Sequence, residues 1–217
     1  MIKSGETVRL VFAGGGTGGH LYPALAIADR LKEMLCDRYT VDFHFVGTRR
    51  GIEFRLQDTL GYPLHLSQMQ GIVRALTLRN LLVPFVVLIA LWQSMRLMRQ
   101  LSPLMVIGTG GYVCWPVLKA ASWKRIPTVI QEQNSFPGIA TRSAAGRAEV
   151  VYLGFDDARR HLPEGTNCLL TGNPVRSKLS GAERSEAHRA FKLDPSRKTI
   201  LVFGGSQGAH AINEAVL

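Results

Sequence analysis

Cysteine and acidic residues are both scarce in this chain of 217 residues, and each shortage argues against a class of protein. The three cysteines, Cys36, Cys114 and Cys168, are widely separated, and none belongs to a C-x-x-C pair. The spacing therefore argues against a disulfide framework and against a zinc site. Residues 1–6 contain no apolar signal core, so we expect the protein to stay in the reducing cytoplasm.

Acidic residues are absent from the whole stretch between Asp58 and Glu132, and the chain carries a net charge of +10. The same stretch holds seven Lys and Arg residues and the most apolar run of the chain, residues 81–92. This run is too short to span a bilayer, and it suits either a buried helix or a helix lying on an anionic membrane surface. Nucleic acid is not an expected partner, because no aromatic residues alternate with the basic ones and no recognised module is present.

A glycine turn at residues 12–20 lies between an apolar strand and an amphipathic helix. Residues 7–13 are rich in β-formers, and apolar residues recur at helical spacing over residues 22–35, with Pro23 expected in the first helical turn. The many glycines allow a close backbone approach to a ligand, and free N–H groups at a helix start favour a phosphate. The sequence therefore predicts an anion site here. The alternative is that the glycines serve only to pack the strand against the helix.

A dinucleotide cofactor is opposed by the residues that follow the second expected strand. Gly14, Gly16 and Gly19 satisfy the pattern G-x-G-x-x-G, which is weak evidence when it stands alone. A dinucleotide fold needs Asp or Glu at the end of the next strand, but the strand at residues 40–46 is followed by Gly-Thr-Arg-Arg at residues 47–50. We therefore expect no nicotinamide cofactor.

The remaining chain alternates short apolar strands with helical segments, which is typical of an α/β fold with a parallel sheet. A second glycine turn occupies residues 108–112, and a polar run at residues 131–134 leaves the carboxyl end of a strand, where open α/β sheets bind ligands. The expected strands are residues 7–13, 40–46, 64–66, 105–107, 128–130, 150–152 and 168–170, and the expected helices are residues 22–35, 51–60, 78–100, 117–123 and 138–147.

A second domain is expected after the first, which we place at residues 1–173. Further on, residues 199–203 predict a strand, residues 204–208 a glycine turn and residues 209–217 the start of a helix. This pattern is the opening of a second nucleotide-binding half. We expect residues 174–217 to be a linker and the incomplete start of that half, which would need on the order of 100 to 150 further residues.

Five motifs, taken in order, resemble those of the MurG-type glycosyltransferases of family 28. They are GGGTGGH at residues 14–20, GTGGY at 108–112, EQN at 132–134, TGNPVR at 171–176 and GGSQGA at 204–209. The resemblance implies two facing Rossmann-like domains of the GT-B type. Residues 1–173 would be the domain on the acceptor and membrane side, and residues 174–217 would be a linker and the truncated start of the UDP-sugar-binding domain. The resemblance also implies an inverting hexosyltransferase of peptidoglycan synthesis. Such an enzyme moves N-acetylglucosamine from UDP-N-acetylglucosamine to undecaprenyl-pyrophosphoryl-N-acetylmuramoyl-pentapeptide (lipid I), which gives lipid II.

The same motifs imply the site residues. Nucleotide-sugar contacts fall on Thr17, Gly18, Gly19, Asn134, Arg176 and Ser206, and further substrate contacts fall on Gly110, Gly111, Tyr112 and Gln207. The first two glycine turns are associated with the acceptor pyrophosphate. Inverting transfer needs a base for the acceptor hydroxyl, and we expect His20 in this role, with Glu132 as the alternative. The N-terminal ends of the helices at Gly19 and Gly208, together with Arg176, would stabilise the departing UDP. The sequence contains no Asp-x-Asp pattern, and neither a metal nor a cofactor is expected.

The partners implied by the resemblance are UDP-N-acetylglucosamine, lipid I and the anionic cytoplasmic surface of the cell membrane, together with other cell-wall synthesis enzymes. The protein would then be peripheral, at the cytoplasmic face. Residues 86–89 make the apolar segment less basic than the family's membrane patch, so docking is expected to rely on insertion. Two other interpretations stay open, namely another lipid-acceptor glycosyltransferase and a non-catalytic membrane-associated fragment. The chain alone is expected to be inactive.

Overall fold

The computed structural model of the protein describes residues 5–69, 83–176, 183–204 and 210–216. They belong to two compact units, Met1–Pro174 and Val175–Leu217. The roles expected for the two parts of the chain, acceptor side and donor side, stay predictions.

The first unit is built on a sheet of seven parallel strands in the order β3-β2-β1-β4-β5-β6-β7. The strands are β1 (Thr7–Gly14), β2 (Thr40–Thr48), β3 (Leu64–Ser67), β4 (Met105–Gly110), β5 (Thr128–Glu132), β6 (Val150–Leu153) and β7 (Cys168–Leu170). All seven expected strands of this unit are thereby confirmed. The inner strands are apolar on both sides because helices cover both faces of the sheet.

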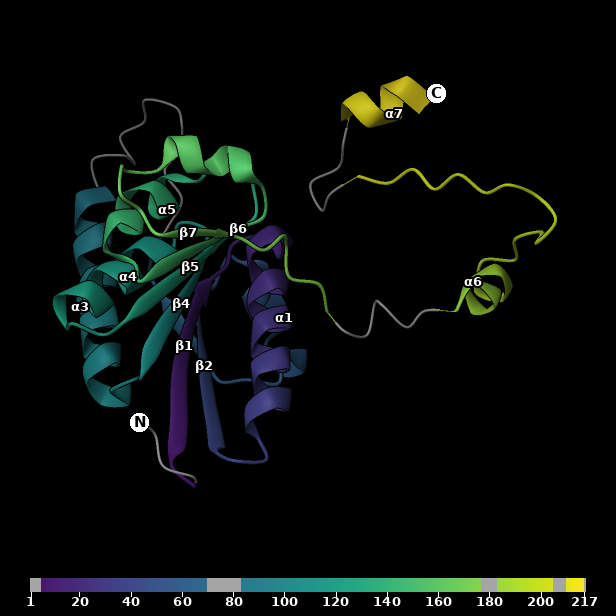
Figure 1. Cartoon of the computed structure of the whole chain (residues 1–217). Helices are drawn as coiled ribbons and strands as arrows, with labels where there is room; N and C mark the ends of the chain where they lie inside the picture. Colours follow the sequence, from purple (N-terminus) through teal and green to yellow (C-terminus); the bar gives the residue numbers. More distant parts are fainter. Residues whose placement is uncertain (1–4, 70–82, 177–182, 205–209, 217) are drawn as a thin grey trace. The chain divides into compact units, whose positions relative to one another are not determined.

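Helices lie on both faces of this sheet, as Figure 1 shows. Helix α1 packs on one face, and α3, α4 and α5 pack on the other. The elements are α1 (Gly18–Leu35), α2 (Ile52–Arg55), η1 (Gln57–Thr59), α3 (Val83–Leu101), α4 (Cys114–Trp123), α5 (Ile139–Ala144), η3 (Ala145–Arg147) and η4 (Asp156–His161). The predicted α/β class is confirmed. The part of the predicted helix over residues 78–82 lies outside the described residues.

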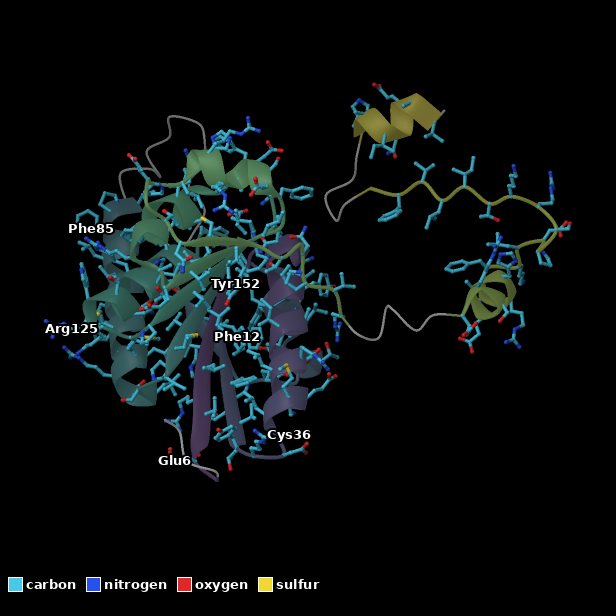
Figure 2. All side chains as sticks on the ribbon, in the orientation of Figure 1. Glu6, Phe12, Cys36, Phe85, Arg125 and Tyr152 are labelled. Atoms are coloured by element: carbon cyan, nitrogen blue, oxygen red, sulfur yellow. The ribbon has the colours of Figure 1, made fainter. Side chains whose placement is uncertain are left out.

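Strand β1 joins two separate apolar cores, because successive side chains point to opposite faces. Phe12 is fully buried on the α1 side, where its ring stacks on that of Phe45 with centroids 4.9 Å apart and 11° between the ring planes. Val11 is fully buried on the other side, among residues of α3, α4 and α5. Figure 2 shows Phe12 within the layers and Phe85 at the outer edge.

Helix α1 begins four residues earlier than expected, at Gly18 instead of Tyr22. The prediction that Pro23 lies in the first turn is therefore wrong, since the residue lies in the second turn. Its ring nitrogen carries no hydrogen, so it donates no bond to the carbonyl group of Gly19, one turn back. His20 is consequently a residue of the helix itself rather than of the loop before it.

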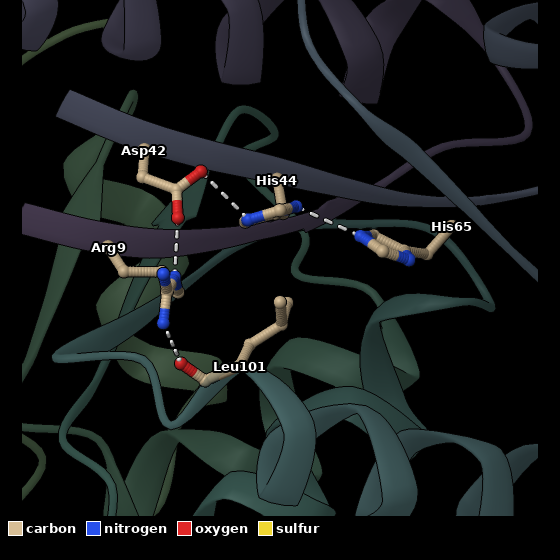
Figure 3. A network of polar contacts seen from close by, with 5 residues as sticks. All are labelled: Arg9, Asp42, His44, His65 and Leu101. Atoms are coloured by element: carbon tan, nitrogen blue, oxygen red, sulfur yellow. Dashed lines mark hydrogen bonds and ion pairs between the residues drawn. The ribbon is translucent and has the colours of Figure 1, made fainter.

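A polar network joins three neighbouring strands to the end of α3 (Figure 3). Arg9 on β1 donates to Asp42 at 2.5 Å and to the carbonyl oxygen of Leu101 at 2.7 Å. Nε2 of His44 lies 3.0 Å from Asp42, and Nδ1 of His44 lies 3.0 Å from Nε2 of His65. Burial alone would raise the pKa of the Asp42 carboxyl, but Arg9 and His44 hold it below its ordinary value. Burial, together with the charge of His44, lowers the pKa of His65.

The second unit contains two short helices among its described residues, α6 (Arg184–Ala190) and α7 (His210–Val216). The predicted strand at residues 199–203 is wrong, because this segment has no regular structure. Its apolar side chains are exposed, and Ile200 reaches 88%. A strand needs a neighbour for its backbone hydrogen bonds, and apolar character alone does not supply one.

Candidate functional site

The strand order places a ligand crevice at the carboxyl ends of β1 and β4. The chain continues from β1 toward β2 and β3 on one side, whereas β4 to β7 extend on the other, so the order reverses between β1 and β4. Open α/β sheets bind ligands at this reversal. The two glycine turns predicted from the sequence follow these two strands, and the polar run at residues 131–134 ends β5 beside them.

The two glycine turns are packed directly against each other. A Cβ atom added to Gly111, whose φ is +80°, would overlap the carbonyl oxygen of Gly15. One added to Gly110 would lie 2.7 Å from Nδ1 of His20, and one added to Gly14 would overlap the hydroxyl of Thr109. These glycines are therefore required for contact between the turns, a role that differs from the strand-to-helix packing considered from the sequence.

Gly19 differs from those glycines, because its missing side chain faces open space. The nearest atom to an added Cβ is Oγ1 of Thr17, at 3.7 Å. His20 and Leu21 donate to the carbonyl oxygen of Thr17, whereas helical geometry leaves the N–H groups of Gly18 and Gly19 without an intrahelical partner. The helix start therefore offers two amide donors and the positive end of the macrodipole, which together suit an anion.

The imidazole of His20 is held in one orientation by two oxygen atoms. Its Nδ1 lies 3.0 Å from the carbonyl oxygen of Thr109 and 3.1 Å from Oε1 of Gln133. The amide nitrogen of Gln133 donates to the same carbonyl group and to that of Gln131, which fixes the orientation of its side chain. Two acceptors at Nδ1 place the proton there in the neutral ring, so Nε2 carries the lone pair. This tautomer is the one that a general base needs.

Glu132, the alternative candidate for the base, is buried and fully engaged. Only 3% of the residue is exposed. One carboxylate oxygen accepts from the backbone N–H and the side-chain amide of Asn134, at 3.1 and 2.9 Å, and the other accepts from the N–H of Gly138 at 3.3 Å. These bonds favour a role in positioning Asn134 over a role in proton transfer.

Gln133 and Asn173, to which the sequence assigned no individual role, link parts of the site by hydrogen bonds. The side chain of Gln133 contacts His20, and Asn173 accepts from Gln131 and donates to the carbonyl oxygen of Gln133, both at 3.3 Å. The polar run after β5 was the sequence signal for Gln133. Asn173 lies after β7 in the chain, and its contact with β5 depends on the sheet order.

Of the other predicted site residues, Tyr112 lies in the site, because its ring lies against Gly16 of the first glycine turn. The hydroxyl of Tyr112 lies 3.1 Å from that of Thr48, so it faces the end of β2. Arg176 belongs to the second unit. Ser206 and Gln207 lie outside the described residues. No group of three or more His, Cys, Asp or Glu side chains in the described part of the chain is arranged to hold a metal ion.

Helix α3 exposes an apolar stripe on its outer face. Phe85, Leu88 and Trp92 are each more than 60% exposed, and they recur at helical spacing along one side. The guanidinium of Arg96 lies over the Trp92 ring, 5.9 Å from its centroid. Among the described residues, no helix combines the length and the apolar character that crossing a membrane requires.

The model of the glycosyltransferase family 28 N-terminal domain matches residues 10–153, more than half of the chain. The chain belongs to this family. The match to family 28 runs from β1 to the end of β6, so it includes both glycine turns, His20 and the polar run after β5. The resemblance inferred from the five motifs is thereby confirmed.

Curated relatives in family 28 are similar along almost the whole chain. One is the UDP-N-acetylglucosamine–N-acetylmuramyl-(pentapeptide) pyrophosphoryl-undecaprenol N-acetylglucosamine transferase of Prosthecochloris aestuarii, 45% identical over 213 residues, or 96% of this chain and 57% of the relative. The protein of the same name from Desulforamulus reducens is 42% identical over 217 residues, or 97% and 56% of the two chains. The chain therefore spans somewhat more than half the length of these relatives.

Solved structures agree with the family assignment. MurG of Acinetobacter baumannii is 32% identical, with a TM-score of 0.61 over 78% of this chain and 46% of that one. The UDP-GlcNAc 2-epimerase of Neisseria meningitidis is 12% identical, with a TM-score of 0.56 over 89% of this chain and 56% of that one. The second likeness shows the fold alone. The predicted α/β fold of the GT-B type is confirmed for the first unit.

Proposed function

We propose that this chain is the acceptor-side portion of an enzyme that transfers N-acetylglucosamine from UDP-N-acetylglucosamine to lipid I, giving lipid II. The observation that carries the proposal is the orientation of His20, whose Nδ1 faces two acceptors and whose Nε2 is therefore the basic atom. His20 lies in the first turn of α1, directly after Gly18 and Gly19. The family membership and the names of the curated relatives support the choice of substrates.

In the proposed reaction, Nε2 of His20 takes the proton from the 4-hydroxyl of the N-acetylmuramoyl sugar. The oxygen then forms a bond to the anomeric carbon of N-acetylglucosamine, and the bond from that carbon to UDP breaks, so that UDP leaves with the electron pair. The amides of Gly18 and Gly19, together with Asn134 and Arg176, are proposed to bind phosphate and sugar groups. Ser206, Gln207, Gly110, Gly111 and Tyr112 remain proposed substrate contacts, and Glu132 remains the second candidate for the base.

The test is transfer of radiolabelled N-acetylglucosamine to a lipid I analogue. We would assay this chain by itself and this chain joined to the C-terminal part of the Prosthecochloris aestuarii relative. Label in lipid only with the joined protein would support the proposal. If both proteins are folded and neither transfers label, the proposal fails and the chain is a non-catalytic binding module.

The proposed role of His20 is tested in the joined protein. His20→Ala is expected to lower kcat by roughly 10²- to 10⁴-fold, as for loss of a general base, and to change KM for the donor much less. His161→Ala is the matched control, because His161 is exposed on η4 and is not one of the predicted site residues. An unchanged kcat in His20→Ala would remove His20 from the mechanism.

We further propose that the protein binds peripherally to the anionic cytoplasmic face of the membrane, through the exposed stripe on α3. Apolar side chains beside Arg96 and Arg99 suit insertion between anionic headgroups. The test is sedimentation with vesicles that contain phosphatidylglycerol. Replacing both Phe85 and Leu88 by Ser should abolish binding, whereas Met34→Ser, at an exposed position on α1, should not. Equal binding by both variants would refute the role of α3.

A further inference from the structure

Glu53 is an acidic residue buried in the middle of the site region, with 1% of its surface exposed. It lies in the short helix α2, after the end of β2. Three glycines surround its side chain. A Cβ atom added to Gly15 would lie 2.6 Å from its carboxylate, and one added to Gly47 or Gly51 would overlap the side chain. The space that these glycines leave is therefore filled by Glu53.

The carboxylate of Glu53 accepts backbone hydrogen bonds from two loops. Oε2 accepts from the N–H of Gly16 in the first glycine turn, at 2.8 Å, and Oε1 accepts from the N–H of Thr48 at the end of β2, also at 2.8 Å. Gly16 has a φ of +91°, and an amide in such a turn is a typical anion donor. Glu53 thus binds the first turn as an external phosphate would.

The same group is linked to the second glycine turn through Thr48. The hydroxyl of Thr48 lies 3.4 Å from Oε1 of Glu53 and 3.1 Å from the hydroxyl of Tyr112. The ring of Tyr112 also covers Gly16, since a Cβ added there would lie 2.9 Å from the ring. One buried carboxylate therefore connects the turn after β1, the end of β2 and the turn after β4.

We propose that Glu53 is a positioning residue that occupies the inner anion position of the first glycine turn. It holds Gly16 and Thr48 by hydrogen bonds and orients Tyr112 through Thr48. A phosphate-bearing substrate is then excluded from the Gly16 amide and is bound by the amides of Gly18 and Gly19. This second step rests on the proposed function, whereas the occupation of the turn by Glu53 does not.

The first experiment uses the unaltered chain and inorganic pyrophosphate as the probe. Amide resonances would be followed by ¹⁵N–¹H NMR during a titration. We expect pyrophosphate to shift the amides of Gly18 and Gly19 and to leave that of Gly16 unchanged. A shift of Gly16 as large as that of Gly19 would overturn the proposal. No shift of any of these amides would overturn the phosphate site at α1, and with it the donor part of the proposed function.

The second experiment compares Glu53→Gln with Glu33→Gln. Glutamine keeps the size of the side chain, but its NH₂ group must face one of the two N–H donors. Hydrogen exchange of the Gly16 or Thr48 amide is expected to be on the order of 10- to 100-fold faster, as for loss of a hydrogen bond to a charged acceptor. Glu33 is exposed on α1 and pairs with Arg30 at 3.0 Å, so its replacement changes the charge equally without touching the turn.

A result that a purely structural role would not produce comes from repeating the titration on Glu53→Ala, because glutamine would still fill the space beside Gly16. With the carboxylate and most of the side chain removed, pyrophosphate is expected to shift Gly16 as well, since the inner position has lost its own anion. If exchange in Glu53→Gln matches that in Glu33→Gln and pyrophosphate leaves Gly16 unshifted in Glu53→Ala, the proposal is wrong. If neither Glu53 variant folds, the titration of the unaltered chain still decides the question.

Discussion

Replacing single glycines in the two turns should separate packing from ligand binding. Gly111→Ala introduces a Cβ that overlaps the carbonyl oxygen of Gly15, a backbone atom that yields only if the first turn moves. The positive φ of Gly111 adds about 1–2 kcal/mol for a residue with a side chain, and overpacking typically adds about 1–3 kcal/mol. We therefore expect Gly111→Ala to lower the free energy of unfolding by about 2–5 kcal/mol.

Gly19→Ala should behave in the opposite way. Its Cβ would meet nothing closer than 3.7 Å, and Gly19 has a helical position in the first turn of α1. Alanine is the better helix former, so the free energy of unfolding should stay the same or rise by up to about 1 kcal/mol. Its methyl group would, however, occupy the open space next to the proposed phosphate site.

The assay for both variants is urea unfolding followed by circular dichroism, and their difference is the decisive quantity. Equal destabilisation by Gly111→Ala and Gly19→Ala would refute the reasoning, because the two positions would then be packed alike. The pyrophosphate titration then tests ligand binding. Gly19→Ala should remain folded and should no longer bind pyrophosphate.

Four further predictions follow from individual side chains. Burial raises the pKa of the Cys114 thiol from 9.0 to about 12, which lowers its thiolate fraction at pH 8 about a thousandfold, so maleimide should label the exposed Cys36 first and Cys114 only on unfolding. The pKa of His65 is lowered by folding, so the unfolded chain binds a proton first as the pH falls through 6.5. The free energy of unfolding should therefore decrease as the pH is lowered from 7 to 5, and this decrease should be smaller in His65→Gln. Phe12→Ala should lower the free energy of unfolding in urea by about 3–5 kcal/mol, because the ring is fully buried. In the joined protein, Arg176→Ala should raise KM for the donor and lower kcat, and normal kinetics would contradict a phosphate-binding role.

Much of the fold was predictable because parallel strands buried on both faces have a distinctive pattern. Residues 7–13 and 128–130 are short apolar runs that end in polar or glycine-rich loops, and both are strands in the structure. Residues 199–203 have the same pattern and form no strand. Local composition indicates where a strand can form, but a strand exists only where a neighbour accepts and donates its backbone bonds.

The start of α1 was misplaced because glycine is a poor helix former. Gly18 and Gly19 nevertheless lie in the helix, since the turn after β1 directs the chain onto the sheet face at that point. Propensity over a few residues is a weak indicator beside such a tertiary constraint. His20 was predicted as a candidate base from its place in the motif, and its tautomer depends on a carbonyl group 89 residues away.

The sequence by itself determined the α/β class, the seven strands of the first unit, the two glycine turns and the family, because each of these depends on periodicity or on short motifs. Only the tertiary structure decided what the glycines are for. Gly14, Gly110 and Gly111 allow the two turns to touch, and Gly15 makes room for Glu53, whereas Gly19 alone of these five faces open space. Contacts between residues distant in the chain arise from the order of strands in the sheet, and no local pattern encodes that order.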